Sequence, residues 1–477
     1  MKAHALTLIL CLAALGLAAQ PLSLDSCVAL ALRNQAAMRV AQLDLESARQ
    51  TSKAAFTHHF PTVSLSAAAF QADGSLVDIQ ASKDGSQSGV DFNLDLTLDG
   101  QTADGRIEQL QQLIDGFGLN INLDALLQEI ANHFDYNATL QMLDHGLTAG
   151  ATLIWPLYAG GQISRGNELA QLGVDAAQLQ LQIATNEVTL GVEQRYWLIA
   201  SLLEKRNTLS EAQTLLDTLR HDAEAAHAAG VIGRNDLLKV KLRQNELAAQ
   251  TTQLDNGLQL ALMALCQYIG LDYTPTLTPA DSLGTHLPTM PLADSTSLAT
   301  LADRRPEAQL LNLAVSADHL RYRMALGQAL PQLAVGATYG LSNTGGTNLN
   351  PHGLVFATLN IPLTAWWETS HNARKQHLEL EKTAWRNIDL RQQLALQLQQ
   401  ARNQAAEALA LVSVRRQAVD DAADNLREVQ SYYAAGLATT GELLEAQMLL
   451  QQARADLTDQ LITYRLRHKT YTLMLQP

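Results

Sequence analysis

The sequence predicts a mainly α-helical protein that also carries four membrane-type β-strands and is built from two internal repeats. Long stretches without proline have apolar residues at heptad spacing, which is typical of coiled-coil helices. Four short segments alternate between apolar and polar residues with period two, as half-buried strands do. Prolines and glycines recur at fixed separations along the chain, which indicates repetition of one structural unit.

Residues 1–19 have the pattern of a secretory signal peptide. Lys2 supplies a positive start, an apolar run spans Leu6–Leu17, and small residues follow at a cleavage zone. The run is shorter than the ~20 apolar residues of a transmembrane helix, and no later stretch reaches that length. A buried N-terminal helix is the alternative interpretation. We therefore expect an exported protein.

Two cysteines remain after this leader, Cys27 and Cys266. Export permits a disulfide bond. Both residues lie on apolar faces of predicted helices, however, and this favours two buried thiols over a disulfide.

The repeat is visible in matched landmarks. One pair of prolines and one pair of glycines are each 206 residues apart, and a second pair of prolines is 270 apart: Pro156 and Pro362, Gly230 and Gly436, Pro61 and Pro331. Each copy has the order helix, Pro-led strand, strand, long helix, glycine turn, helix. The difference between the two offsets indicates a loop about 64 residues longer between the strands of the first copy.

These landmarks divide the mature chain into a first repeat (20–270), a linker (271–300) and a second repeat (301–477). The linker contains four of the 12 prolines, so we expect it to be extended. The helical hairpins of the two repeats should turn near residues 230 and 436.

The longest predicted helices cover about Ser164–His227 and Ser370–Tyr433. At ~1.5 Å per residue each would reach roughly 95 Å. The seam of the first runs through apolar residues three or four places apart, Leu169, Leu172, Ala176, Leu179 and Ile183. A shorter helix with the same spacing follows each glycine turn.

The predicted strands are Thr62–Gln71, Leu147–Trp155, Gln332–Leu341 and Leu354–Ile361. Their lengths are close to the ~9–11 residues of a tilted membrane strand. Aromatic residues in or beside them suit a membrane interface: Phe70, Trp155, Tyr339 and Phe356. A small water-soluble sheet is the alternative that periodicity leaves open.

Several features together resemble the TolC family of outer-membrane efflux proteins. They are the leader, the segment LSLDSCVALALRNQAAM, the repeated helix–Pro–strand units and the long helices with Ala-Ala-Gly turns. Local matches are RRPEAQ at Arg304–Gln309 and WPLYAGGQ at Trp155–Gln162. The resemblance covers nearly the whole mature chain except residues 72–146. It implies a homotrimer in which four strands per chain form one 12-stranded β-barrel, continuous with an α-helical coiled-coil barrel.

The resemblance also implies a location and a function. The barrel would lie in outer-membrane lipid and the helices would extend into the periplasm. The trimer would conduct substrate passively from an inner-membrane pump, through a periplasmic adaptor protein, in drug efflux or type I secretion. A structural protein that spans the periplasm and presents an acidic surface loop is the alternative.

Other classes of function find little support in the sequence. No zinc-binding, nucleophile-elbow or phosphate-loop pattern occurs, so we expect no enzyme and no cofactor. The net charge is −14 and no basic stripe is present, which argues against a nucleic-acid partner.

The two glycine turns are the first candidate site. Glycine at a helix C-terminus supplies the left-handed conformation that a reversal needs. In the family the corresponding turns dock the periplasmic adaptor. The resemblance therefore implies adaptor contacts at Ala229, Gly230, Val231, Ala435, Gly436 and Leu437.

The second candidate site is a periplasmic gate. Glu442 and Glu445 share one helical face, and a three-fold axis would turn them into two rings of carboxylates that favour cations. Asp236 is the repeat-mate of Glu442. The family's latching basic residue is replaced by Ala438, and Arg234 is a candidate substitute. The alternative is that Glu442 and Glu445 only stabilise the N-terminus of their helix and do not form a gate.

Residues 72–146 form the long loop between the first two strands, which faces outside the cell in this topology. The segment has 13 acidic and two basic residues, a net charge of −11. VDFNLDLTL is a possible strand, and helical patterns lie near Arg106–Ile114 and Asp124–Phe134. The alternating acids lack the glycine and closing glutamate of a calcium loop, so we predict no metal site.

Overall fold

A computed structural model describes residues 22–71, 77–83, 90–98, 101–104, 138–142, 145–273, 277–281, 283, 287–291, 297–344, 349–363 and 365–476. The predicted leader, residues 1–19, lies outside these ranges. Contacts divide the chain into a helical unit (residues up to 55, 165–323 and 373–477) and a strand unit (56–164 and 324–372). The division follows the type of element, so both repeats contribute to both units.

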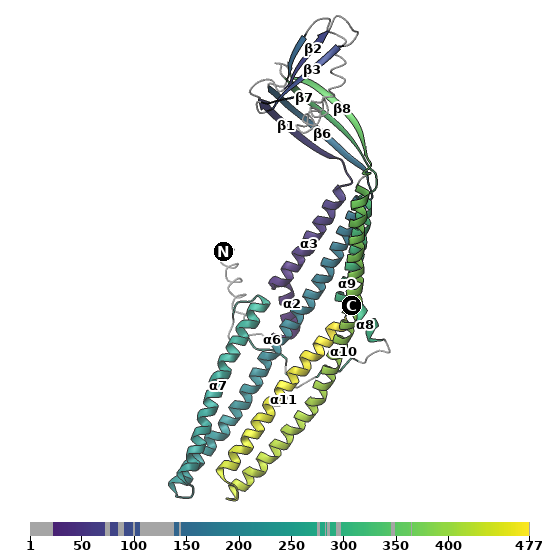
Figure 1. Cartoon of the computed structure of the whole chain (residues 1–477). Helices are drawn as coiled ribbons and strands as arrows, with labels where there is room; N and C mark the ends of the chain where they lie inside the picture. Colours follow the sequence, from purple (N-terminus) through teal and green to yellow (C-terminus); the bar gives the residue numbers. More distant parts are fainter. Residues whose placement is uncertain are drawn as a thin grey trace, which may run out of the picture. The chain divides into compact units, whose positions relative to one another are not determined.

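The strand unit contains a four-stranded antiparallel sheet in the order β1-β6-β7-β8 (Figure 1). Its strands are β1 (Thr62–Gln71), β6 (His145–Ala159), β7 (Gln332–Thr344) and β8 (Asn350–Asn360). All four predicted strands are therefore confirmed, and three of them are longer than the alternating segments. The pairing of β6 with β7 joins the two repeats in one sheet.

The register gives this sheet two chemically different faces, because paired residues in an antiparallel sheet lie on the same side. Val335, Ala337 and Tyr339 of β7 pair with apolar residues or glycine on both neighbouring strands. A bulge between Pro156 and Tyr158 places Trp155 and Tyr158 on this same apolar face. The opposite face is rich in serine, threonine and glycine.

The predicted interfacial aromatics are thus not all on one face. Trp155 and Tyr339 lie on the apolar face, whereas Phe356 pairs with Gly336 on the opposite face. The side chain of Phe70 lies outside the described side chains. Phe356 departs from the prediction because a period-two pattern gives alternation but does not say which face meets lipid.

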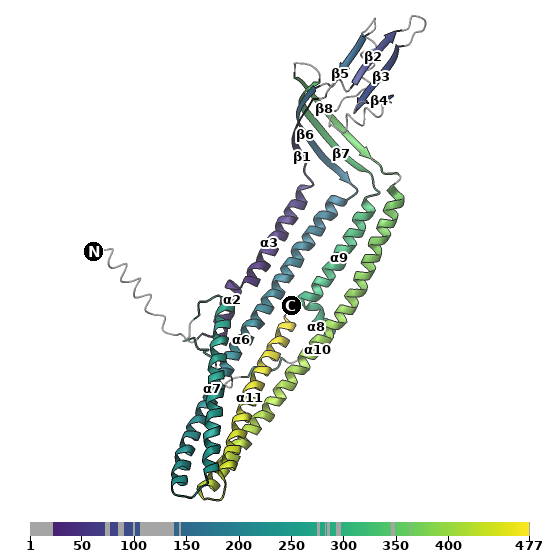
Figure 2. The ribbon, with the colours of Figure 1, turned by 60° about the vertical axis from the view of Figure 1, so that its left-hand side comes forward.

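A second antiparallel sheet, in the order β4-β3-β2-β5, occupies the long loop between β1 and β6 (Figure 2). Its strands are β2 (Val77–Lys83), β3 (Val90–Leu98), β4 (Gln101–Asp104) and β5 (Ala138–Met142). The strand predicted at VDFNLDLTL is confirmed as β3. The two predicted helical patterns, 106–114 and 124–134, lie outside the described residues.

Two long helical hairpins dominate the helical unit, and their turns lie at the same end (Figures 1 and 2). The first is α6 (Gln162–Ala228) with α7 (Arg234–Ile269), and the second is α10 (Ala365–Ala434) with α11 (Thr440–Leu475). The predicted helix bounds of 164–227 and 370–433 agree with α6 and α10 within five residues. The predicted reversals near 230 and 436 follow them.

Shorter helices complete this unit: α2 (Leu24–Asn34), α3 (Ala36–Thr57), α8 (Leu298–Arg304) and α9 (Pro306–Gly327). The main core packs α2 against α6, α7 and α11, with Tyr196, Leu265 and Tyr464 fully buried. A second core near the turns joins both hairpins through residues such as Leu216, Val240 and Leu443. The two hairpins therefore share buried apolar surface.

Cys27 on α2 and Cys266 on α7 are buried free thiols, as the apolar faces indicated. Burial, reinforced by the nearby Asp281 carboxylate, raises the pKa of the Cys27 thiol to about 12. Among the helices that the structure describes, none combines the length and apolar character needed to cross a membrane.

Candidate functional site at the helix turns

The first helical turn closes with a Schellman motif. The N–H of Val231 donates to the carbonyl of Ala226 at 2.9 Å, and the N–H of Gly230 donates to that of His227 at 3.0 Å. These bonds need a left-handed residue at the reversal, and Gly230 has φ +73°. The predicted conformational role of this glycine is confirmed.

The second turn repeats the geometry of the first. The N–H of Leu437 donates to the carbonyl of Tyr432 at 2.8 Å, the N–H of Gly436 donates to that of Tyr433 at 3.0 Å, and Gly436 also has φ +73°. The residue after each glycine projects into solvent, with Val231 76% and Leu437 78% exposed. Each turn thus presents one large apolar side chain that the rest of the chain leaves mostly uncovered.

Glu442 caps the helix that follows the second turn. Its carboxylate accepts hydrogen bonds from the N–H of Thr439 at 2.6 Å and from the Thr439 hydroxyl at 2.9 Å, while that hydroxyl accepts from the N–H of Glu442. This is a capping box. The bond from the Thr439 N–H, followed by that from its hydroxyl, lowers the pKa of the Glu442 carboxyl. Glu445 is exposed one turn further along.

The matching acid of the first turn has a different partner. Asp236 lies in the first turn of α7, and its carboxylate pairs with Lys239 at 3.1 Å. The Nζ atom of Lys239 lies 3.9 Å from the position that a Cβ would take on Gly441, in the first turn of α11. Lys239 therefore lies between the beginning of α7 and the beginning of α11.

Polar side chains continue this contact between α7 and α11. Arg243 donates to Gln451 at 2.8 Å, and Gln451 donates to Gln250 at 3.0 Å. Gln447 is only 4% exposed, and neither of its amide atoms has a hydrogen-bond partner among the described residues. An unsatisfied buried amide is costly, so this interface is less well matched than the apolar cores beside it.

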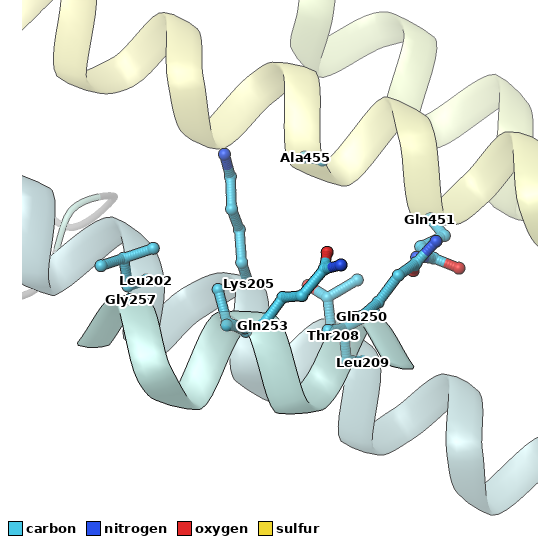
Figure 3. A pocket seen from close by; sticks show the side chains of 10 residues that line it. Leu202, Lys205, Thr208, Leu209, Gln250, Gln253, Gly257, Gln451 and Ala455 are labelled. Carbon is cyan, nitrogen blue, oxygen red and sulfur yellow. The ribbon is translucent and has the colours of Figure 1, made fainter. Parts of the chain in front are cut away.

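A pocket of about 360 Å³ opens where the first hairpin meets α11. Figure 3 shows Lys205 extending from α6 toward α11, whereas Gln250 lies on the other side of the pocket, beside Gln451. Lys205 forms an ion pair with Asp459 of α11 at 2.6 Å. Leucines also line this pocket, at Leu202, Leu209 and Leu254, so the two hairpins are incompletely packed in this region.

The structure brings the predicted gate residues to one end of the helical unit. Asp236 and Arg234 begin α7, and Glu442 and Glu445 lie in the first turns of α11. Lys239 was missed by sequence reasoning. Its i,i+3 spacing from Asp236 was visible in the sequence, but its approach to the second hairpin depends on tertiary packing.

Among the side chains that the structure describes, no cluster of three or more His, Cys, Asp or Glu residues is placed to hold a metal ion. The arrangement at the turns consists of exposed apolar tips, capped helix ends and charges close to solvent. These features suit protein contact and ion attraction.

Comparison by sequence finds no match: no protein-family model and no curated protein matches the chain. Comparison of the fold is informative. The outer-membrane channel CmeC of Campylobacter jejuni superposes with a TM-score of 0.72 at 14% identity, covering 95% of this chain and 85% of CmeC. VceC, an outer-membrane protein of Vibrio cholerae, gives a TM-score of 0.66 at 15% identity, covering 95% and 94%.

The MtrE outer-membrane channel of Neisseria gonorrhoeae, in its open state, gives a TM-score of 0.68 at 14% identity and covers 95% of this chain and 89% of MtrE. The chain therefore has the fold of these outer-membrane proteins over nearly its whole length. The resemblance to the TolC family drawn from sequence motifs is confirmed at the level of the fold.

Proposed function

We propose, from a fold shared with outer-membrane channels, that this protein is the passive exit duct of a tripartite efflux or type I secretion system. The observation that carries the proposal is the two-faced sheet β1-β6-β7-β8. Its apolar face is exposed in the single chain, with Leu65 at 86%. Exposed apolar surface of this kind suits contact with lipid, while the serine- and threonine-rich face suits a water-filled lumen.

Oligomerisation follows from the number of strands, and the resemblance to the TolC family implies that the oligomer is a homotrimer. Four strands leave β1 and β8 as open edges, and unpaired backbone groups are not tolerated in lipid. Single-chain barrels begin at about eight strands. Three copies that pair β8 with β1 would supply 12 strands and remove every edge, placing the protein in the outer membrane.

Purified protein in planar lipid bilayers tests this proposal. We expect trimers on cross-linking and stepwise ion conductance. Monomers without conductance would instead favour a structural protein that presents the inserted sheet.

The exposed residues of the turns are the proposed docking points for a periplasmic adaptor protein: Ala229, Gly230, Val231, Ala435, Gly436 and Leu437. The support is the projection of Val231 and Leu437 from two equivalent turns. A photo-cross-linker at either position should capture an adaptor in cells. Leu396, which is 70% exposed on α10 away from the turns, is the matched control position. Equal capture from all three positions would contradict docking at the turns.

The proposed periplasmic gate comprises Glu442, Glu445, Asp236 and Arg234, with Lys239 added. Support comes from the position of Lys239 between Asp236 and the start of α11. Replacing Glu442 and Glu445 together by Gln should weaken cation selectivity and block by divalent cations in the bilayer. Glu428→Gln, at the same end of α10, is the control for loss of charge alone. If cation selectivity is unchanged in the double variant, Glu442 and Glu445 are not part of the gate.

A further inference from the structure

The inward face of the sheet contains an apolar band that its function as a water-filled wall does not require. Most of this face is small or polar, as in the row Ser64, Thr152 and Thr338. The adjoining row runs Thr62, Ile154, Gly336 and Phe356. Leu354 pairs with Thr338 and thus lies beside Phe356 on the same face.

Gly336 determines where the ring of Phe356 lies. A Cβ on Gly336 would be 2.3 Å from Cζ, 2.7 Å from Cε2 and 2.8 Å from Cε1 of that ring. The outer edge of the ring therefore rests directly on the backbone of β7, in space that any other residue would fill. The ring of Phe356 can lie there only because Gly336 has no side chain.

An aromatic ring over a glycine also has a structural role, because such cross-strand pairs stabilise sheets. The outer face has one as well, where a Cβ on Gly353 would be 3.2 Å from the ring of Tyr339. That role does not account for Ile154 and Leu354, which remain 43% and 45% exposed on the inward face. Two large aliphatic side chains beside the ring widen the apolar surface well beyond the glycine.

We propose that Ile154, Leu354 and Phe356 form an apolar collar in the lumen, at which the apolar part of an amphiphilic organic cargo makes contact during passage. The inference rests on the proposed function, since it takes the inward face to line a channel. Three-fold repetition would place nine apolar side chains at about one level of an otherwise polar wall. A collar of this kind slows apolar molecules by contact and leaves small hydrated ions unhindered.

The test uses two probes of equal charge on the full-length protein in a planar bilayer. Tetraphenylphosphonium carries aromatic rings, whereas tetramethylammonium is small and hydrophilic. Block of the potassium current by each cation is titrated for the natural protein and for the triple variant Ile154→Thr, Leu354→Thr, Phe356→Thr. Threonine keeps strand propensity.

We expect the triple variant to weaken block by tetraphenylphosphonium about tenfold or more, because it removes three large apolar side chains from the contact surface. Block by tetramethylammonium should change little. Val355→Thr, on the apolar face of the same strand, is the matched control and should leave both titrations unchanged.

Unchanged block by tetraphenylphosphonium in a conducting triple variant would overturn the collar while leaving the channel intact. Absence of conductance in the natural protein would overturn the proposed function itself. If the triple variant forms no channels, the same titration is carried out on the single variant Leu354→Thr. This variant keeps the ring of Phe356 over Gly336 and so preserves the cross-strand contact. A smaller loss of affinity for tetraphenylphosphonium then supports the collar, and an unchanged affinity rejects it.

Discussion

At the scale of single residues, the two turns show how one backbone requirement fixes an amino acid. Gly230 and Gly436 share φ +73°, and a Cβ at either glycine would meet no other atom within 4 Å. Space is therefore available, and the strain of the left-handed conformation alone selects glycine. The sequence motif could be interpreted correctly because this requirement is local.

We expect Gly436→Ala to destabilise the protein by about 1–2 kcal/mol, the cost of a left-handed non-glycine residue. Gly173→Ala is the matched control, because Gly173 lies within α6 with open space around it. That replacement should stabilise by roughly 0.5–1 kcal/mol through helix propensity. Denaturant unfolding monitored by helical circular dichroism measures both. Equal changes in the free energy of unfolding for the two variants would contradict backbone strain as the reason for glycine at position 436.

Glu442 should make the start of α11 sensitive to acid. Its folded-state pKa is lowered, so the capping contribution is present above the unfolded-state pKa and is lost as the pH falls through the folded-state pKa. Amide hydrogen exchange in the first turn of α11 should therefore accelerate in acid beyond its intrinsic pH dependence. Glu445→Gln should leave this transition in place, whereas Glu442→Ala should abolish it. A transition that persists in Glu442→Ala would assign it to another group.

Cys27 should resist modification in the folded protein. Its burial and its pKa of about 12 leave almost no accessible thiolate at pH 8. We expect iodoacetamide to label both cysteines of the mature chain in denaturant and neither under native conditions. Rapid native labelling of Cys27 would contradict its place in the core.

At the scale of elements, the linker between the repeats is fastened to the helices. Tyr196 donates to Asp281 at 2.7 Å and to the carbonyl of Leu22 at 3.0 Å, while Asp281 also accepts from the N–H of Leu24. Arg465 of α11 donates to the carbonyl of Leu283 at 3.0 Å. These bonds hold linker residues on α6 and α11, where proline content alone predicted an extended chain.

Tyr196→Phe should therefore destabilise the protein by about 1–3 kcal/mol, since it removes a part-buried hydrogen bond to the Asp281 carboxylate and leaves the N–H of Asp281 without the Tyr196 hydroxyl as its acceptor. Tyr432→Phe is the matched control, because it removes the exposed bond from Tyr432 to Glu428 and should cost far less. Chemical unfolding compares the two variants. A loss of equal size would show that the linker is not fastened through Tyr196.

Elements with strong periodicity were predictable, and contacts between elements were not. The long helices and four strands followed from heptad and period-two patterns. The face of the sheet on which Phe356 lies and the approach of Lys239 to α11 depend on register and tertiary packing. The capping box was visible only in part, because Glu442 was recognised as an acid near a helix N-terminus but its bonds to Thr439 were not.

At the scale of the whole molecule, the acidic insertion between β1 and β6 begins and ends at neighbouring positions of the sheet. Gln71 pairs with His145 at the end of the β1–β6 ladder, so the two ends of the inserted segment meet. β7 and β8 are joined by a far shorter connection, which shows that this sheet needs no long loop. The pairing of β1, β6, β7 and β8 therefore does not depend on the insertion, which is an addition to this sheet.

Replacing residues 72–144 by a two-residue Asn-Gly turn should leave trimer formation and bilayer conductance intact, because this turn suits a tight hairpin. The net charge should become less negative by 11 units, since all 13 acidic and both basic residues of the segment are removed. Size-exclusion chromatography and single-channel recording measure the outcome. A control variant that deletes β8 should lose both properties. Loss of conductance in the loop replacement would make the insertion part of the duct.

In both repeats a tryptophan bonds to the chain just before a strand, but from different positions: Trp155 precedes Pro156, whereas Trp366 follows Pro362, the repeat-mate of Pro156. Trp155 donates its indole N–H to the carbonyl of His59 at 3.0 Å, and Trp366 donates to that of Ala329 at 3.1 Å. Each carbonyl stands two residues before the proline that opens a first strand, Pro61 or Pro331. The two glycine turns agree more closely, in their hydrogen bonds and in φ +73°, and this agreement points to duplication of a unit half as long. The two halves then diverged, and the first carries a second sheet between its two strands where the second has a short connection.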